Sequence, residues 1–283
     1  MKLFNQIQGN PIFRTRIRKI YGRYFYWSWA KWIGKKKILS PYINPLDLVV
    51  KEAFPSSVQN YIFGLEDFSE MGFLMHFLRK DDFFVDIGAN IGAYSLLAAG
   101  VSEAFVLSFE PDDARRDFLK EQVMVNGLHP LIYIDSRVVG TKEETLIFSE
   151  HSVSKNIYVE AGVPRIAVSI DSLELEKTPN MVKIDAKGYG LEVIQGMRQL
   201  LEHEDMKAVI CSFSEDIEPE IRDLTREIIR SEGFKVCSYD PVNRVLEESA
   251  ELDKELMLFV RDLDFAQQRL ALAKSFSWFN KQI

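Results

Sequence analysis

Short apolar runs alternate with longer amphipathic segments along most of the chain after residue 82. The runs are rich in Val, Ile, Leu and Phe and predict buried strands, whereas apolar residues spaced by three and four predict helices. Strands are predicted at 83–87, 104–109, 132–134, 181–185, 208–213, 234–238 and 256–260, and helices at 70–78, after Gly92, and at 113–125, 191–201, 218–231 and 264–274. This alternation indicates an α/β fold with a doubly wound, mostly parallel sheet, in which strand 256–260 pairs antiparallel.

Several shorter apolar runs fall outside this alternation. The runs 144–148, 157–160 and 165–168 predict an inserted antiparallel excursion between the third and fourth strands. Before the first strand, 48–50 and 61–63 predict two short strands, which follow a linker interrupted by Pro41 and Pro45.

The first predicted strand runs directly into a polar turn that contains glycine. Asp86, Gly88, Asn90 and Gly92 form D-x-G-x-N-x-G, and an Ala- and Leu-rich helix follows. The two glycines let the backbone pass close to a ligand, and the first turn of the helix presents unpaired N–H groups. The turn therefore predicts a nucleotide-binding loop, although a tight turn without a ligand has the same pattern.

A carboxylate follows the second predicted strand, where Glu110 precedes Pro111. In a βαβ unit this position accepts hydrogen bonds from ribose hydroxyls, so loop and carboxylate together predict an adenosine site. The loop lacks the G-x-G-x-x-G pattern of dinucleotide sites. Its aspartate would repel a pyrophosphate but suits the sulfonium and ammonium groups of S-adenosylmethionine (SAM). The candidate cofactor-binding residues are Asp86, Gly88, Asn90, Gly92, Glu110 and Pro111.

Four motifs in order resemble those of the FkbM-type SAM-dependent methyltransferases. They are V-D-I-G-A-N-I-G at 85–92, S-F-E-P at 108–111, S-I-D-S-L at 169–173 and V-K-I-D-A-K-G at 182–188. The resemblance covers roughly residues 70–261. It implies a Rossmann-like class I methyltransferase fold with a seven-stranded sheet, SAM as cofactor and, usually, a hydroxyl as methyl acceptor.

The candidate catalytic residues follow the fourth predicted strand, because open α/β sheets carry their chemistry at the carboxyl ends of strands. Methyl transfer mainly requires that the acceptor oxygen be aligned and relieved of its proton. We expect Asp185 to accept or orient that proton, with Lys183 on the same strand face and Lys187 beyond it. Asp185 could instead cap helix 191–201 or brace the cofactor loop, and Asp171 could be a similar brace.

The chain departs from the resembled family directly after K-I-D. The family usually continues with a hydrophobic residue and E-G-x-E, whereas Lys187 and Gly190 stand at the two glutamate positions. The exchange implies a different acceptor, a different base or an absence of activity if those glutamates take part in catalysis. Alternatively, Lys187 binds an anionic substrate such as a uronic acid or a phosphate-bearing glycan.

Composition limits the remaining classes of site. Cys211 and Cys237 lie in apolar runs without C-x-x-C spacing, which is typical of reduced core residues in a cytosolic protein. The four histidines are scattered without ligand spacing, so no metal site is predicted. The 283 residues suffice for one catalytic domain with an appendage, and we predict an N-terminal extension at 1–46 and a methyltransferase domain at 47–283.

Charge and aromatic residues are distributed unevenly. Residues 1–46 contain ten Lys and Arg but no Asp or Glu, whereas the other 237 residues carry 25 basic and 42 acidic side chains. Three of the four tryptophans also lie in the basic segment. Its aromatic rings could pack on the catalytic domain or on a second subunit, or residues 1–37 could contact an anionic membrane surface. Nucleic-acid binding is a third alternative.

No apolar run reaches the ~18 residues that a membrane-spanning helix needs, and no secretory signal is evident. We expect a cytoplasmic protein, with peripheral contact to the inner membrane face as the open alternative.

Three functions remain open. The first is an O-methyltransferase that acts on a saccharide or lipid-linked glycan. The second is a SAM-binding but catalytically silent partner of a glycan-assembly enzyme, which would explain Lys187 and Gly190. The third is a methyltransferase that acts on nitrogen or on a small non-sugar metabolite.

Overall fold

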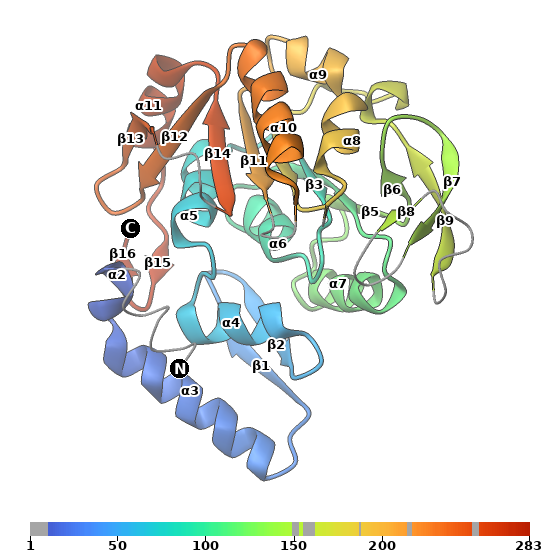
Figure 1. Cartoon of the computed structure of the whole chain (residues 1–283). Helices are drawn as coiled ribbons and strands as arrows, with labels where there is room; N and C mark the ends of the chain where they lie inside the picture. The colour runs from blue at the N-terminus through green and yellow to red at the C-terminus, as the bar shows by residue number, and fades with distance from the viewer. Residues whose placement is uncertain (1–10, 149–152, 155–161, 187, 214–216, 251–254) are drawn as a thin grey trace.

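An eight-stranded sheet forms the centre of the molecule. The computed structural model describes residues 11–148, 153–154, 162–186, 188–213, 217–250 and 255–283. The strand order is β13-β12-β14-β11-β10-β3-β4-β5 (Figure 1). The strands from β11 to β5 are parallel, and β14 is antiparallel to both of its neighbours. Their bounds are β3 Phe83–Ile87, β4 Phe105–Phe109, β5 Ile132–Asp135, β10 Met181–Ile184, β11 Ala208–Ser212, β12 Lys235–Asp240, β13 Val245–Glu248 and β14 Leu256–Val260.

The predicted doubly wound sheet is confirmed, and one strand is added to the seven that were predicted. The additional edge strand, β13, forms an antiparallel hairpin with β12. In the turn, Asp240 Oδ1 accepts a hydrogen bond from the backbone N–H of Val242, and Arg244 has a φ of 57°. All four residues of β13 are exposed or only partly buried, so the strand lacks the apolar run by which a strand is predicted.

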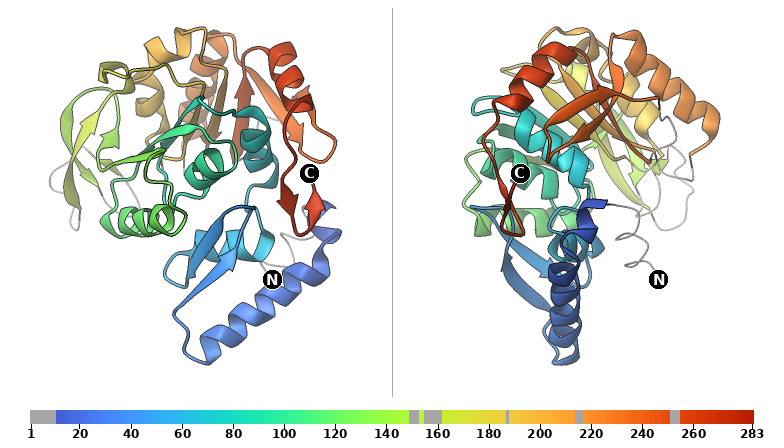
Figure 2. Two further views of the ribbon diagram at one scale, coloured as in Figure 1. Left: turned by 180° about the vertical axis from the view of Figure 1, so that it is seen from behind. Right: turned by 90° about the vertical axis from the view of Figure 1, so that its left-hand side faces the viewer.

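Helices cover both faces of the sheet (Figure 2). One face packs against α5 Phe68–Phe77, α6 Ala93–Gly100, α7 Asp113–Val125 and α11 Leu263–Ala271, and the other against α8 Gly190–Gln195, α9 Arg198–Glu202 and α10 Pro219–Ser231. Neighbouring residues of β3 face different cores, since Phe84 belongs to the first and Val85 to the second. Both are fully buried, as expected for a central strand covered on two sides.

Two predicted elements differ in the structure. Residues 61–63 are the last turn of a helix, α4 Pro55–Phe63, because Pro55 starts the helix and Gly64 follows it at a φ of 79°. An apolar run of three residues is too short to distinguish a strand from a helix. The predicted helix 191–201 is divided into α8 and α9 at Gly196, which approaches the backbone of Gly140 closely.

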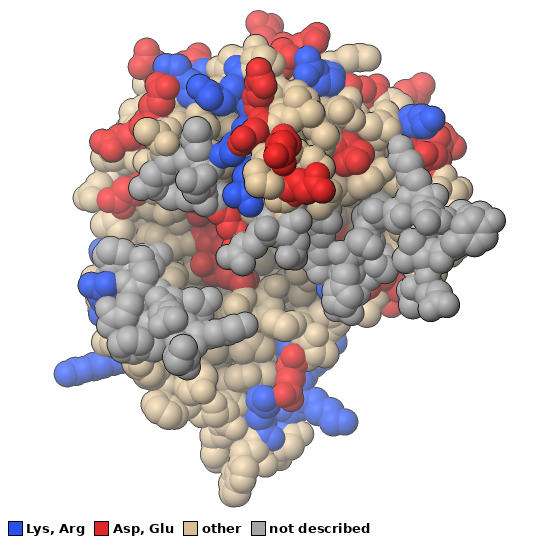
Figure 3. Space-filling view, viewed as in Figure 1, with Lys and Arg blue, Asp and Glu red and all other residues tan. Residues whose placement is uncertain are grey.

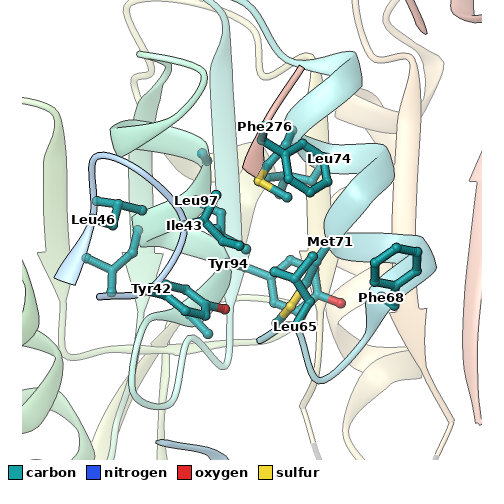
Figure 4. Packing of buried hydrophobic residues seen from close by; sticks show 14 of the residues in the cluster. Tyr42, Ile43, Leu46, Leu65, Phe68, Met71, Leu74, Tyr94, Leu97 and Phe276 are labelled. Atoms are coloured by element: carbon teal, nitrogen blue, oxygen red, sulfur yellow. The ribbon is translucent and has the colours of Figure 1, made fainter. Parts of the chain in front are cut away.

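The N-terminal residues form a layer beside the sheet. The layer contains α2 Pro11–Arg14, α3 Ile17–Trp32, α4, the hairpin of β1 Lys37–Pro41 and β2 Asp47–Lys51, and the C-terminal hairpin of β15 Ser277–Trp278 and β16 Lys281–Gln282. Gln122 of α7 hydrogen-bonds both backbone groups of Val49 in β2. Figure 4 shows Tyr42, Ile43 and Leu46 in the same core as Leu97 of α6. The predicted boundary after residue 46 falls inside the hairpin of β1 and β2. The division into 1–46 and 47–283 stays a prediction.

A small second sheet lies between β5 and β10 in the sequence. It contains β6 Val138–Val139, β7 Glu144–Phe148, β8 Val153–Ser154 and β9 Val163–Val168 in the order β6-β9-β7-β8. The antiparallel pair of β7 and β9 confirms the predicted excursion, whereas its predicted run 157–160 lies outside the described residues. Among the helices that the structure describes, none is both long and apolar enough to cross a membrane.

Candidate active site

The loop between β3 and α6 lies against the carboxyl end of β10. Gly88 has a φ of 74°, and a Cβ atom there would lie 2.1 Å from the carbonyl oxygen of Asp185. Gly92, with a φ of 82°, is the N-cap of α6. Asn90 between them also has a positive φ, of 54°. Position 88 therefore needs glycine because its backbone packs against the backbone of Asp185, whether or not a ligand is bound.

Glu110 joins this loop to the end of β4. Its Oε2 accepts a hydrogen bond from the backbone N–H of Asn90 at 2.7 Å, and its Oε1 accepts one from the backbone N–H of Asp112 at 2.9 Å. Burial raises the pKa of Glu110, against the effect of these two backbone hydrogen bonds. The predicted pair of Asn90 and Glu110 thus lies together, although the two residues are twenty positions apart.

A first cavity opens beside this junction. Gly88, Asn90, Glu110 and Pro111 line it, together with residues of the second sheet and the start of α8 such as Val139 and Tyr189. Four of the six predicted cofactor-binding residues therefore line one cavity. The other two, Asp86 and Gly92, do not line it.

Asp86 is one of those two, and it is completely buried. Its Oδ2 accepts a hydrogen bond from the hydroxyl of Ser95 at 2.6 Å, and its Oδ1 lies 3.6 Å from Lys183 Nζ. Burial raises the pKa of Asp86, although the Lys183 ammonium opposes that shift. The geometry makes Asp86 a brace between the loop, α6 and β10.

A second cavity, of about 430 Å³, lies on the other side of Asn90 and Asp185. We call it the acidic cavity, because Glu66, Asp67, Asp185 and Glu255 line it together with Lys183. Figure 3 shows acidic side chains in a hollow beside β14. Ser56 and Asn60 of α4 and Ser212 at the end of β11 complete the polar part of its wall. Because Asn90 and Asp185 line both cavities, the two meet at the end of β10.

Lys183 is the buried cation of the acidic cavity. Its Nζ lies 3.6 Å from Asp86 Oδ1 and 3.6 Å from Asp185 Oδ2, and over the ring of Tyr94. Burial alone would lower the pKa of Lys183, but the carboxylates of Asp185, Asp86 and Asp67 raise it above the usual value. Lys183 is therefore charged at neutral pH.

Asp185 follows β10 directly, and its side chain is partly exposed where the two cavities meet. Tyr189 is the N-cap of α8, without a side-chain hydrogen bond, so the structure does not support Asp185 as the cap of this helix. Asp171 does act as a brace, but of α9: its carboxylate accepts hydrogen bonds from the backbone N–H groups of Gln199 and Leu200.

Glu66 and Asp67 were not among the predicted site residues. Burial, followed by the charges of Asp67 and Asp185, raises the pKa of Glu66 to about 8. Asp67 accepts a hydrogen bond from the hydroxyl of Tyr94 at 2.9 Å, and burial raises its pKa as well. The sequence contained one signal for them, because these two consecutive carboxylates interrupt the otherwise apolar run 61–68.

Of the two residues that depart from the resembled family, the structure describes only Gly190. Lys187 lies outside the described residues. Gly190 is the first residue of α8, and a Cβ atom there would meet no heavy atom within 4 Å. In the described part of the chain, no three His, Cys, Asp or Glu side chains are placed to hold a metal ion.

Comparisons with known proteins identify a family and several proteins of similar sequence or fold. The model of the methyltransferase FkbM domain matches residues 86–265. Hexuronic acid methyltransferase AglP of Haloferax volcanii is 27% identical over 162 residues. The match covers 54% of this chain and 64% of that protein, so this chain spans less than two thirds of the relative's length. The solved methyltransferase FkbM of Methylobacillus flagellatus KT is 16% identical with a TM-score of 0.45, covering 72% of this chain and 54% of its own. A SAM-dependent O-methyltransferase of Thermotoga maritima is 13% identical with a TM-score of 0.41, covering 69% and 64%. Since the family model spans more than half of its residues, this chain belongs to the FkbM methyltransferase family.

Proposed function

We propose that this protein transfers the methyl group of SAM to a hydroxyl of a saccharide or lipid-linked glycan. The observation that carries the proposal is the junction of the two cavities at Asp185, with Glu110 in one and Lys183 in the other. Family membership supports methyl transfer from SAM, and the name of the Haloferax relative supports a saccharide acceptor.

The first cavity fits the adenosine end of SAM. A carboxylate has about four acceptor positions, and Glu110 uses two of them for backbone N–H groups, so two are available for the ribose hydroxyls. Gly88, Asn90 and Pro111 complete the wall on this side. In this proposal Asp86 and Gly92 shape the loop without contacting the cofactor.

The acidic cavity fits the methionyl end of SAM and the acceptor. Bound SAM supplies a methyl carbon made electrophilic by positively charged sulfur, and its ammonium group adds a second cation. Glu66 and Asp67 line this cavity beside Asp185, and a bound cation would favour the ionised form of both carboxyl groups. Hydroxyl groups of a neutral sugar are also good hydrogen-bond donors to carboxylates.

Asp185 is the proposed proton acceptor. As the acceptor oxygen bonds to the methyl carbon, the carbon–sulfur bond breaks with its electrons on sulfur, and the hydroxyl proton passes to the Asp185 carboxylate. Lys183 holds that carboxylate in place through the 3.6 Å ion pair. Because Asp185 is partly exposed, the proton then passes to solvent.

The described wall of the acidic cavity favours a neutral acceptor over an anionic one. Four carboxyl groups line it beside one ammonium, and an anionic ligand would be repelled by those that are ionised and would favour protonation of Glu66 still further. A hexuronate would therefore need a cation from outside this wall, which is the role that the sequence suggests for Lys187.

Calorimetric titration with SAM tests the cofactor site. Loss of the two ribose hydrogen bonds in Glu110→Gln should raise Kd by about 100-fold, since hydrogen bonds to a charged group contribute about 1.5 kcal/mol or more each. Glu227→Gln, an exposed carboxylate on α10, is the matched control and should bind SAM as the native chain does. Circular dichroism confirms that the variants fold. Unchanged SAM affinity in Glu110→Gln would refute the site.

Methyl transfer to a panel of neutral saccharides then separates the functions. Asp185→Asn should lower kcat by about 100-fold or more with little change in SAM affinity, as expected for loss of a proton acceptor. SAM binding without transfer to any acceptor would favour the silent partner, which the exchange at Lys187 and Gly190 makes the second candidate. Methyl transfer only to amines would show that the acceptor atom is nitrogen and that the proposed hydroxyl acceptor is wrong.

A further inference from the structure

The two sides of α3 have opposite character. Ile20, Trp27 and Ala30 are buried in the core on the side that packs against α4. Phe25, Trp29 and Trp32 are 63%, 51% and 83% exposed. Residues three and four positions apart share one face of a helix, so these three rings form a single stripe on the side away from the core. We call it the aromatic stripe.

Basic side chains flank the aromatic stripe. Arg18, Lys35 and Lys36 are exposed and have no carboxylate partner within the described part of the chain. Acidic partners come only from beyond residue 46, as in the pair of Lys31 and Glu52, because residues 1–46 contain none. In Figure 3 the end of the molecule where α3 lies is largely uncharged, with basic groups and some acidic atoms at its margin.

We propose that the outer face of α3 docks on an anionic lipid membrane, with the aromatic stripe in the interfacial layer and the basic residues on lipid phosphates. Indole and phenyl rings favour that layer, and Lys and Arg bind anionic headgroups beside it. A second copy of the chain fits this face less well, because Arg18, Lys35 and Lys36 of the two copies would repel one another. A double-helical nucleic acid would need basic residues at the centre of this face, where it has three rings.

The position of α3 links the membrane to the acidic cavity. Arg23 of α3 donates a hydrogen bond to the carbonyl oxygen of Tyr61 in α4 at 2.6 Å. On its other side, α4 places Ser56 and Asn60 in the wall of the acidic cavity. α4 therefore lies between α3 and the acidic cavity, an arrangement that would suit an acceptor carried by a lipid. This consequence rests on the proposed function, whereas the docking itself does not.

Vesicle sedimentation of the full chain tests the proposal. Vesicles of phosphatidylcholine with about 30% phosphatidylglycerol should pellet the protein, and phosphatidylcholine alone should pellet much less. Phe25→Ser/Trp29→Ser/Trp32→Ser should lower binding at least about tenfold, since partitioning scales with the apolar area buried. Raised salt should weaken binding of the native chain. Fluorescence of Trp29 and Trp32 should shift to shorter wavelength on binding.

A matched variant and a size measurement make the test decisive. Met124→Ser/Tyr133→Ser/Leu272→Ser removes three exposed apolar side chains elsewhere on the surface and should bind vesicles as the native chain does. Circular dichroism checks that both variants fold. The proposal fails if the native chain does not pellet with anionic vesicles or if the aromatic variant pellets equally well. It also fails if the native chain is a dimer that the aromatic variant dissociates, because the stripe would then be a subunit interface.

Discussion

Burial raises the pKa values of Glu66, Asp67 and Asp86 in the same part of the molecule. The Lys183 ammonium opposes each of these shifts, while Asp185 adds to them by repulsion. The pKa of Lys183 is raised as well, because its carboxylate neighbours outweigh its burial. With more carboxylates than ammonium groups, the folded protein holds protons here that the unfolded chain would release. A cationic ligand would relieve this imbalance, which agrees with the proposed place for SAM.

Glu66 predicts a specific dependence of stability on pH. Its pKa is about 8 in the folded protein and about 4.5 when unfolded, so between these values the folded state binds the extra proton. The contribution of Glu66 to the free energy of unfolding is therefore present below pH 4.5 and lost as pH rises through 8. Glu66→Gln has no such proton. Between pH 5 and pH 9 the free energy of unfolding of the native chain should therefore fall by about 4 kcal/mol more than that of Glu66→Gln.

Urea denaturation of both chains at pH 5 and pH 9 measures this difference. Glu227→Gln, on the exposed side of α10, controls for the loss of one negative charge and should show no comparable effect. If Glu66→Gln and the native chain lose the same free energy between the two pH values, Glu66 does not hold the proton.

The site residues that directly follow parallel strands were predicted from the sequence, whereas Glu66, Asp67 and Glu255 were not. Asn90, Glu110 and Asp185 were predictable because parallel strands end at one edge of the sheet, and the structure brings them together at the cavity junction. Glu66 and Glu255 reach the acidic cavity from segments before α5 and before β14. The approach of Glu66 depends on how the N-terminal layer docks on the sheet, which no local pattern encodes. Glu255 lies directly before antiparallel β14, at the edge of the sheet where β11 ends.

The break between α8 and α9 shows how one contact can divide a helix. Residues 191–201 have helical spacing throughout, yet Gly196 ends α8 against the backbone of Gly140 in the loop after β6. The backbone N–H of Asp171 also donates a hydrogen bond to the carbonyl oxygen of Gly196. A helix that continued past Gly196 would use that carbonyl for its own hydrogen bonding. Tertiary packing therefore overrides the periodicity that predicted one helix.

Gly196→Ala should destabilise the protein markedly. A Cβ atom there would lie 1.9 Å from the carbonyl oxygen of Gly140, so one of the two backbones must move. We expect the free energy of unfolding to fall by about 3 kcal/mol, because overpacking of a rigid contact destabilises a protein by about that amount. Gly190→Ala in the first turn of α8 is the control, and with open space around it should be neutral or slightly stabilising. Urea denaturation measures both, and equal stability of the two variants would contradict the contact.

On the scale of the whole molecule, the two ends of the chain share one core with the sheet. Trp278 of the C-terminal hairpin packs against Phe13 and Phe68, and its indole N–H donates a hydrogen bond to the carbonyl oxygen of Phe63 at the end of α4. The last contact joins residues 215 positions apart. The parallel sheet was predictable from local periodicity and motif order, whereas this arrangement depends on side chains whose spacing in the sequence carries no signal.

Trp278 therefore tests whether the N-terminal layer and the sheet unfold together. Trp278→Ala should lower the free energy of unfolding by about 3–5 kcal/mol, the usual cost of truncating a buried large aromatic residue. Trp278→Phe keeps most of the packing but leaves the Phe63 carbonyl without its donor, which should cost about 1–3 kcal/mol. Phe63 ends α4, and the Glu66 segment follows it directly, so Trp278→Ala should also weaken SAM binding by loosening the wall of the acidic cavity. In urea, far-ultraviolet circular dichroism and tryptophan fluorescence should follow one shared transition. Two separate transitions would mean that residues 1–46 form an independent unit, and that the wall which α4 contributes to the acidic cavity can detach from the sheet.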